Sequence, residues 1–129
     1  MIWYVAIGSI LGGVLRYALG GWIQERAGTG FPVQTLVINV TGSFLLGLFQ
    51  RYALDSTVFT PEIRTMLTIG FCGSYTTFST FSFETVRMLQ DGDWRRAGAY
   101  MGLSVMLSVG AAILGIVTAR ELLAMRTRL

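Results

Sequence analysis

The sequence predicts an all-α membrane protein with four transmembrane helices, and three observations carry this prediction. Hydrophobic types make up 53% of the 129 residues, and the mean hydropathy is +0.59. Only 13% of the residues are charged, about half of the fraction that is usual in soluble domains. Long uncharged stretches separate these charges, each near the roughly 20 apolar residues that a membrane-spanning helix needs.

The charges and turn signals place the four spans near residues 2–23, 33–53, 62–89 and 95–122. The first span has no basic segment before its apolar stretch, so we expect a retained helix and not a cleaved signal peptide. Pro32 and Pro61 suit the starts of the second and third helices, because proline is favoured in the first helical turn. The connections are short, so residues 1–129 are predicted to form one transmembrane domain.

The composition argues against several classes of function. Cys72 is the only cysteine, so no intramolecular disulfide can form. The chain has no histidine, which leaves neither a His-assisted nucleophile nor an imidazole ligand for a metal. No set of residues supports an enzyme, and the low charge argues against a nucleic-acid partner.

The arginines divide almost evenly between the two sides of the membrane. With four spans both termini lie on one side, which holds five arginines against four on the other, while Arg16 lies inside the first span. The two groups are Arg51, Arg64, Arg120, Arg126 and Arg128, and Arg26, Arg87, Arg95 and Arg96. The positive-inside rule therefore specifies no orientation. The balance permits an antiparallel homodimer, whereas the alternative is one orientation set by other factors.

Small residues spaced four apart predict close contacts between helices. The pairs are Gly8 with Gly12, Ser9 with Gly13, Ser43 with Gly47, Gly98 with Gly102, and Ser108 with Ala112. Each pair could serve packing within one subunit or contact between subunits, and the sequence leaves both open.

Two polar residues lie inside apolar spans, where polar groups are costly and tend to be functional. The Arg16 guanidinium could attract an anion into a vestibule, extend to the membrane surface, or pair with an acid such as Glu84. The Asn39 amide offers N–H donors without a charge, which suit a small anion. The alternative for Asn39 is a hydrogen bond between helices.

The third span is unusually rich in hydroxyls, with Ser or Thr at eight of the 19 residues from 65 to 83. These residues and Gly73 suggest a break in the helix, which the bilayer tolerates where protein or a water-filled cavity surrounds it. Phe78 and Phe81 share one helix face, and the positive ring edges of two phenylalanines could hold a small anion. Simple packing is the alternative for this pair. The adjacent hydroxyls belong to Ser79, Thr80 and Ser82.

Three sequence elements together resemble one known family. They are Gly12-x-x-x-Arg16, Thr35-Leu-Val-x-Asn39, and Thr77-Phe78-Ser79-Thr80-Phe81-Ser82 followed by Glu84. In order and spacing they are similar to the bacterial fluoride channel family Fluc/CrcB, over all four spans.

The resemblance implies passive, fluoride-selective export across the bacterial inner membrane by a multi-pass, dual-topology antiparallel homodimer with two pores. It implies that the third helix is broken mid-membrane. Phe78 and Phe81 would be the pore phenylalanines, and Asn39 would face fluoride. The other expected pore residues are Ser79, Thr80, Ser82, Tyr100 and Ser108.

The resemblance also implies a structural sodium ion on the dimer axis, bound by the backbone carbonyls of Gly73 and Thr76. Ser74 stands where the family often has a second glycine, and a side chain there would disfavour a positive φ at the break.

Two rival functions remain. One is a small dual-topology cation or multidrug antiporter, which would need a carboxylate deep in the first helix, where this chain has none. The other is a membrane subunit that transports nothing by itself.

Overall fold

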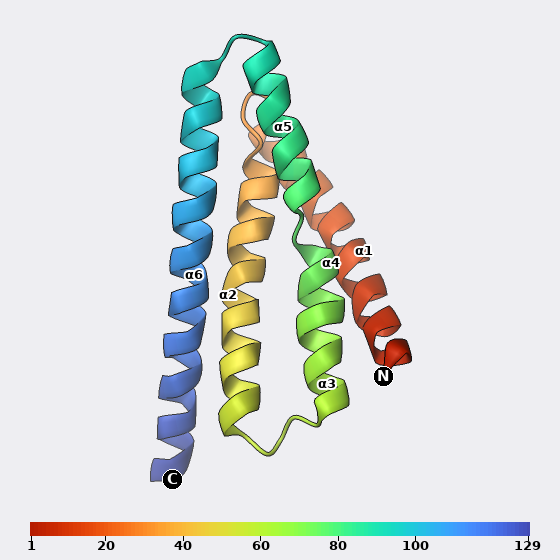
Figure 1. Ribbon diagram of the computed structural model, residues 1–129, viewed down its shortest axis with the longest axis vertical. Coiled ribbons are helices and arrows are strands. Elements are labelled where there is room, and N and C mark those ends of the chain that lie inside the picture. The colour runs from red at the N-terminus through yellow and green to blue at the C-terminus, as the bar shows by residue number, and fades with distance from the viewer.

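The computed structural model describes residues 1–129 and is helical throughout, with no strands (Figure 1). Three helices are long and apolar enough to cross a membrane: α1 (Ile2–Ala27), α2 (Val33–Asp55) and α6 (Trp94–Arg128). The chain between α2 and α6 forms α3 (Pro61–Thr65), the π-helix η1 (Met66–Cys72), α4 (Gly73–Tyr75) and α5 (Phe78–Gln90). The prediction of an all-helical protein is confirmed.

Local signals explain where the helices begin and end. Thr60 caps α3 by accepting a hydrogen bond from the Ile63 amide at 3.2 Å, and Pro61 occupies the first turn. Asp93 caps α6 in the same way through the Arg96 amide, also at 3.2 Å. Helix α6 continues to Arg128, beyond the expected end at 122. At 1.5 Å per residue its 35 residues extend about 52 Å, longer than the roughly 30 Å hydrocarbon core.

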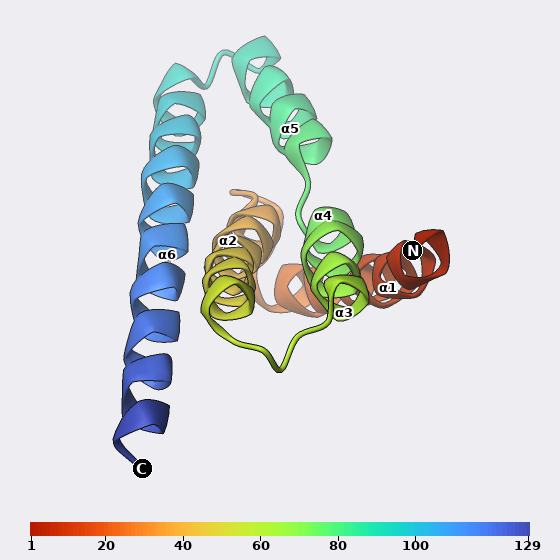
Figure 2. The same ribbon diagram turned by 60° about the horizontal axis from the view of Figure 1, so that its bottom comes forward.

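Helix α2 lies at the centre of the arrangement. It packs along α6 on one side, and contacts α1 and η1 on the other. Figure 2 shows α2 between α6 and α1, and the last turns of α6 project beyond the neighbouring helices in Figure 1. The two termini and the α2–α3 connection lie toward one end of the molecule. The α1–α2 and α5–α6 connections lie at the other (Figure 1).

Large apolar side chains cover much of the outer surface of α1 and α6. Only 19 of the 129 residues are buried, and Trp3, Ile10, Tyr17 and Met106 are each more than 60% exposed. Such a surface would be unstable in water but is suited to contact with lipid or with other apolar helices.

Glycines allow the helices to approach each other closely. A Cβ atom on Gly12 would collide with the Phe71 carbonyl, and one on Gly47 would collide with the carbonyl of Ala112. Gly8 lies equally close to the backbone of η1. These three small residues therefore serve packing within the protomer.

The remaining glycines among the predicted contact pairs have a different position. A Cβ atom on Gly13, Gly98 or Gly102 would meet nothing within 4 Å. Within one chain these three glycines therefore pack against no neighbouring helix, and contact between subunits stays open for them.

Gly12→Ala and Gly13→Ala form a matched pair of adjacent substitutions. The first places a methyl group against the backbone of η1 and should destabilise the protein by about 1–3 kcal/mol, as overpacking does. The second meets open space and should be neutral or stabilising, by up to about 1 kcal/mol. Thermal unfolding of the purified protein in detergent measures both. Equal shifts in the two variants would contradict the packing described here.

Candidate functional site

The helical path from α3 to α5 is interrupted at two residues. Helix α4 ends at Tyr75 and α5 begins at Phe78, and both connecting residues are extended: Thr76 has φ −83° and ψ 158°, and Thr77 has φ −149° and ψ 115°. The interruption therefore begins three residues after Gly73, the glycine from which a break in the helix was predicted.

The side chain of Ser74 does not disturb the backbone of this interruption. Gly73 is helical, with φ −63° and ψ −35°, and the only positive φ angles belong to Gly28 and Gly92. Extended backbone needs no glycine, so a side chain at position 74 is compatible with it. The Ser74 hydroxyl donates to the Ser9 carbonyl at 2.9 Å and joins α4 to α1.

The Asn39 side chain forms hydrogen bonds with both the amide and the carbonyl of the Thr77 backbone. Its Nδ2 donates to the Thr77 carbonyl at 3.1 Å, and its Oδ1 accepts a hydrogen bond from the Thr77 amide at 2.8 Å. The sequence left two interpretations of Asn39, an amide that faces a small anion and a hydrogen bond between helices, and both use its N–H donors. One N–H is used between helices, and the second N–H of the amide makes no hydrogen bond within the protomer.

Thr77 also starts the next helix. Its hydroxyl accepts a hydrogen bond from the Thr80 amide at 3.2 Å, which is the usual role of an N-cap threonine. The same hydroxyl lies 3.0 Å from the Thr80 hydroxyl. Asn39 and the Thr77 cap together set the direction in which α5 leaves the interruption.

A groove of about 320 Å³ lies beside this interruption, between α2, α5 and α6. We call it the central groove. Its polar lining comes from Asn39, Ser43, Thr76, Thr77, Ser104 and Ser108. Phe78 and Phe81 also line it, with ring centroids 5.6 Å apart and planes inclined by 46°. The lining contains no carboxylate and no arginine.

The groove therefore brings together four of the predicted pore residues, Asn39, Phe78, Phe81 and Ser108. It also contains Ser104, which was not among the predicted pore residues. Ser104 is 7% exposed, and its hydroxyl is buried without a hydrogen-bond partner. The spacing of four residues from Tyr100 to Ser104 to Ser108 was a signal that could have identified it.

Tyr100 lies behind Phe81 and does not line the groove. It is fully buried, and its ring centroid is 5.1 Å from that of Phe81. Its hydroxyl donates to the Glu84 carboxylate at 3.2 Å. Tyr100 thus connects the groove to a carboxylate on its far side.

The predicted hydroxyl track is not assembled in the groove. Ser79 is exposed, Thr80 bonds to Thr77, and Ser82 donates to the Phe78 carbonyl of its own helix at 2.9 Å. These hydroxyls bond locally because Ser and Thr side chains readily reach backbone groups within one turn.

Arg16 is half-buried and forms no ion pair. The proposed pairing with Glu84 is wrong, because Glu84 instead accepts the hydrogen bond from Tyr100. The other two interpretations of Arg16, at the membrane surface or in an anion vestibule, stay predictions.

The carbonyls proposed as sodium ligands lie at the end of α4. In a continuous helix the Thr77 amide would bond the Gly73 carbonyl, but here it donates to Asn39. The Thr76 carbonyl belongs to an extended residue outside any helix. Both carbonyls are therefore released from helical pairing, and such oxygens are suitable ligands for a hard cation.

A family model described as "CrcB-like protein, Camphor Resistance (CrcB)" matches residues 3–116. A protein of Geobacter metallireducens named fluoride-specific ion channel FluC is 46% identical over 118 residues, 92% of this chain and 95% of that protein. Proteins with the same name from Syntrophotalea carbinolica and Paramagnetospirillum magneticum are 47% and 49% identical, covering 92% and 89% of this chain and 97% and 91% of their own lengths.

Asn39→Ala should destabilise the fold at the interruption. It leaves the Thr77 amide without a partner, which costs about 1–3 kcal/mol for a buried group. Thr41→Val, two residues further along α2, removes only a hydroxyl that lies 2.8 Å from the Tyr75 hydroxyl and should cost less. Hydrogen exchange of the Thr77 amide in detergent provides the local measurement. Faster exchange is expected in Asn39→Ala alone, and unchanged exchange there would contradict the proposed contact.

Proposed function

The chain belongs to the CrcB-like protein family, and on that premise we propose that it is a fluoride-selective ion channel of the bacterial cell membrane. Fluoride leaves through it passively, without a catalytic residue. The observation that carries this proposal is the central groove, in which Asn39, two phenylalanine rings and three serines meet. The apolar outer surfaces of α1 and α6 support a multi-pass membrane protein.

The chemistry of the groove suits a small, strongly hydrated anion. The free N–H of Asn39 and the hydroxyls of Ser104 and Ser108 can replace water molecules around fluoride. Phe78 and Phe81 present rings whose edges carry partial positive charge, which holds an anion weakly enough for it to leave. The narrow, apolar part of the path then excludes larger anions by size.

The absence of a carboxylate from the groove argues against the rival antiporter. Proton-coupled carriers need a titratable group at the substrate site, whereas the acid nearest to the groove, Glu84, lies beyond Tyr100.

The working unit is proposed to be an antiparallel homodimer in which four spans of each chain cross the membrane and the third is broken mid-membrane. The interruption at Thr76 and Thr77 supports the broken span, because extended backbone at membrane depth must be surrounded by protein or line a cavity. Phe78 is 79% exposed in the single protomer, so its ring is available to a second copy.

A structural sodium ion is proposed at the dimer interface. The Gly73 and Thr76 carbonyls would hold it, since both are released from helical hydrogen bonding and Gly73 is exposed. A bound cation would supply positive charge that offsets the carbonyl dipoles at the two interruptions.

Fluoride efflux from liposomes tests the channel directly. The unmodified chain should release fluoride and retain chloride, and Phe78→Ile and Phe81→Ile should each reduce fluoride efflux roughly tenfold because the ring edges are lost. Phe83→Ile is the matched control on α5, since Phe83 is exposed and does not line the groove. Normal efflux in both groove variants would refute the role of the rings, and no efflux from the unmodified chain would refute the channel.

Sodium removal tests the metal proposal. Unfolding temperature in detergent should rise with sodium concentration at constant ionic strength, with N-methyl-D-glucamine as the replacement cation, because a ligand that binds only the folded form stabilises it. An unfolding temperature independent of sodium would overturn the site.

A further inference from the structure

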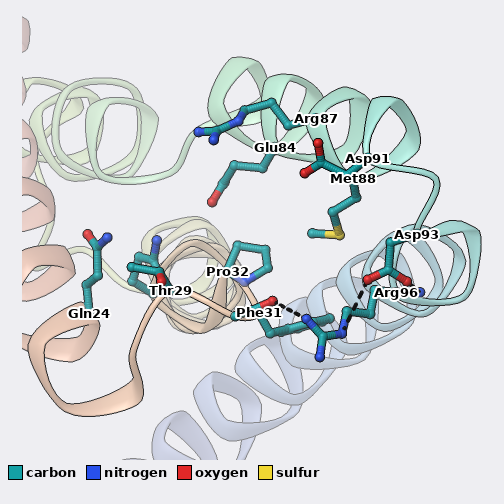
Figure 3. Close-up of a pocket in the computed structure, with 12 residues that line it drawn as sticks. Gln24, Thr29, Phe31, Pro32, Glu84, Arg87, Met88, Asp91, Asp93 and Arg96 are labelled. Carbon is teal, nitrogen blue, oxygen red and sulfur yellow. Dashed lines mark hydrogen bonds and ion pairs between the residues drawn. The ribbon is translucent and has the colours of Figure 1, made fainter.

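A second hollow lies at the end of the molecule formed by the α1–α2 and α5–α6 connections. It has a volume of about 350 Å³ and a largely polar lining (Figure 3). We call it the end pocket. Its charged residues are Glu84, Arg87, Asp91, Asp93 and Arg96. It is distinct from the central groove, with which it shares no lining residue.

A short chain of contacts joins the two hollows. Phe81 lines the central groove, Tyr100 packs on Phe81 with ring centroids 5.1 Å apart, and the Tyr100 hydroxyl donates to Glu84. Glu84 in turn lines the end pocket, and Figure 3 shows its carboxylate directed from α5 toward the α1–α2 connection. The end pocket and the central groove therefore lie on opposite sides of the buried Tyr100 side chain.

The two arginines of the end pocket differ in their freedom. The Arg96 side chain makes two polar contacts. Its Nη1 donates to the Gly30 carbonyl at 2.8 Å, and its Nε lies 3.4 Å from an Asp93 carboxylate oxygen (Figure 3). It thereby joins the two connections and is neutralised by Asp93. Arg87 forms neither an ion pair nor a hydrogen bond and is exposed.

The negative charges of the end pocket oppose an anion. Besides the paired Asp93, Glu84 and Asp91 carry carboxylates that face no cation within ion-pair distance. Arg87 lies three residues after Glu84, on the same face of α5, and its side chain leaves the helix beside that of Glu84 (Figure 3). It is the one positive charge of the end pocket that has no ion-pair partner.

We propose that the end pocket is a mouth of the fluoride path, in which Arg87 attracts the anion against the opposing charges of Glu84 and Asp91. The inference rests on the proposed channel function and adds the residue that sets anion concentration at this mouth. A unit charge about 6 Å from the path in water changes local anion concentration about two- to threefold. The effect depends on ionic strength, because the Debye length falls from about 30 Å at 0.01 M to about 8 Å at 0.15 M.

Fluoride efflux from liposomes at two ionic strengths tests this proposal. Potassium fluoride at about 0.01 M with sucrose gives the low-salt condition, and added potassium gluconate gives the high-salt condition near 0.15 M. At low salt, Arg87→Gln should reduce efflux about two- to threefold, and Asp91→Asn should raise it by a similar factor. Asparagine preserves the turn at Asp91–Gly92, since Asn-Gly favours the same backbone. Both differences should become smaller at high salt, to less than about twofold, because the Debye length of about 8 Å is then close to the distance of the charge from the path.

Arg95→Gln is the matched control. Arg95 is exposed at the same end of the molecule but does not line the end pocket, so its efflux should equal that of the unmodified chain in both conditions. Equal effects of Arg87→Gln and Arg95→Gln would show a general charge effect and overturn the proposal. Unmodified efflux in both Arg87→Gln and Asp91→Asn at low salt would also overturn it. Each of these outcomes requires fluoride efflux by the unmodified chain, so failure of the channel function is recognised separately.

Discussion

The pair of hydrogen bonds between the Asn39 amide and the Thr77 backbone is the interaction on which the rest of the site depends. An extended residue between two helices exposes an amide and a carbonyl that no neighbouring turn can satisfy. Asn39 satisfies both from the adjacent helix, at 2.8 and 3.1 Å. Without that partner, an interruption inside a membrane would leave two backbone groups unsatisfied, which is costly.

Two consequences follow from the pair of hydrogen bonds between Asn39 and Thr77. The Thr77 amide is withheld from the Gly73 carbonyl, which leaves backbone oxygens free near the protomer surface. The start of α5 is also held against α2, so Phe78 and Phe81 lie beside Asn39. One side chain therefore connects the proposed cation ligands with the proposed fluoride path, although the two sites use different groups.

Close backbone contact keeps this geometry in place. Gly8 and Gly12 bring α1 against η1, and Gly47 and Gly115 bring α2 against α6. Few large side chains are buried, so the helices are held together mainly by close packing at these glycines and not by a large apolar core. This is usual in membranes, where lipid is as apolar as the helix surfaces and provides no hydrophobic driving force for their association. The exposed surfaces of the same helices are left for lipid or for a second copy.

The sequence by itself determined the helical class, the helix positions and most of the chemistry of the site. Charges are costly in a bilayer, so their spacing identified the apolar segments, and the Phe78–Phe81 spacing identified two rings on one face. The location of the interruption, the partner of Glu84 and the role of Ser104 were decided only by the tertiary structure. Each depends on a residue far away in the chain: Asn39 holds Thr77 across 38 positions, and Tyr100 reaches Glu84 across 16. Periodicity describes one helix at a time, whereas the pairing of polar groups depends on which helices meet.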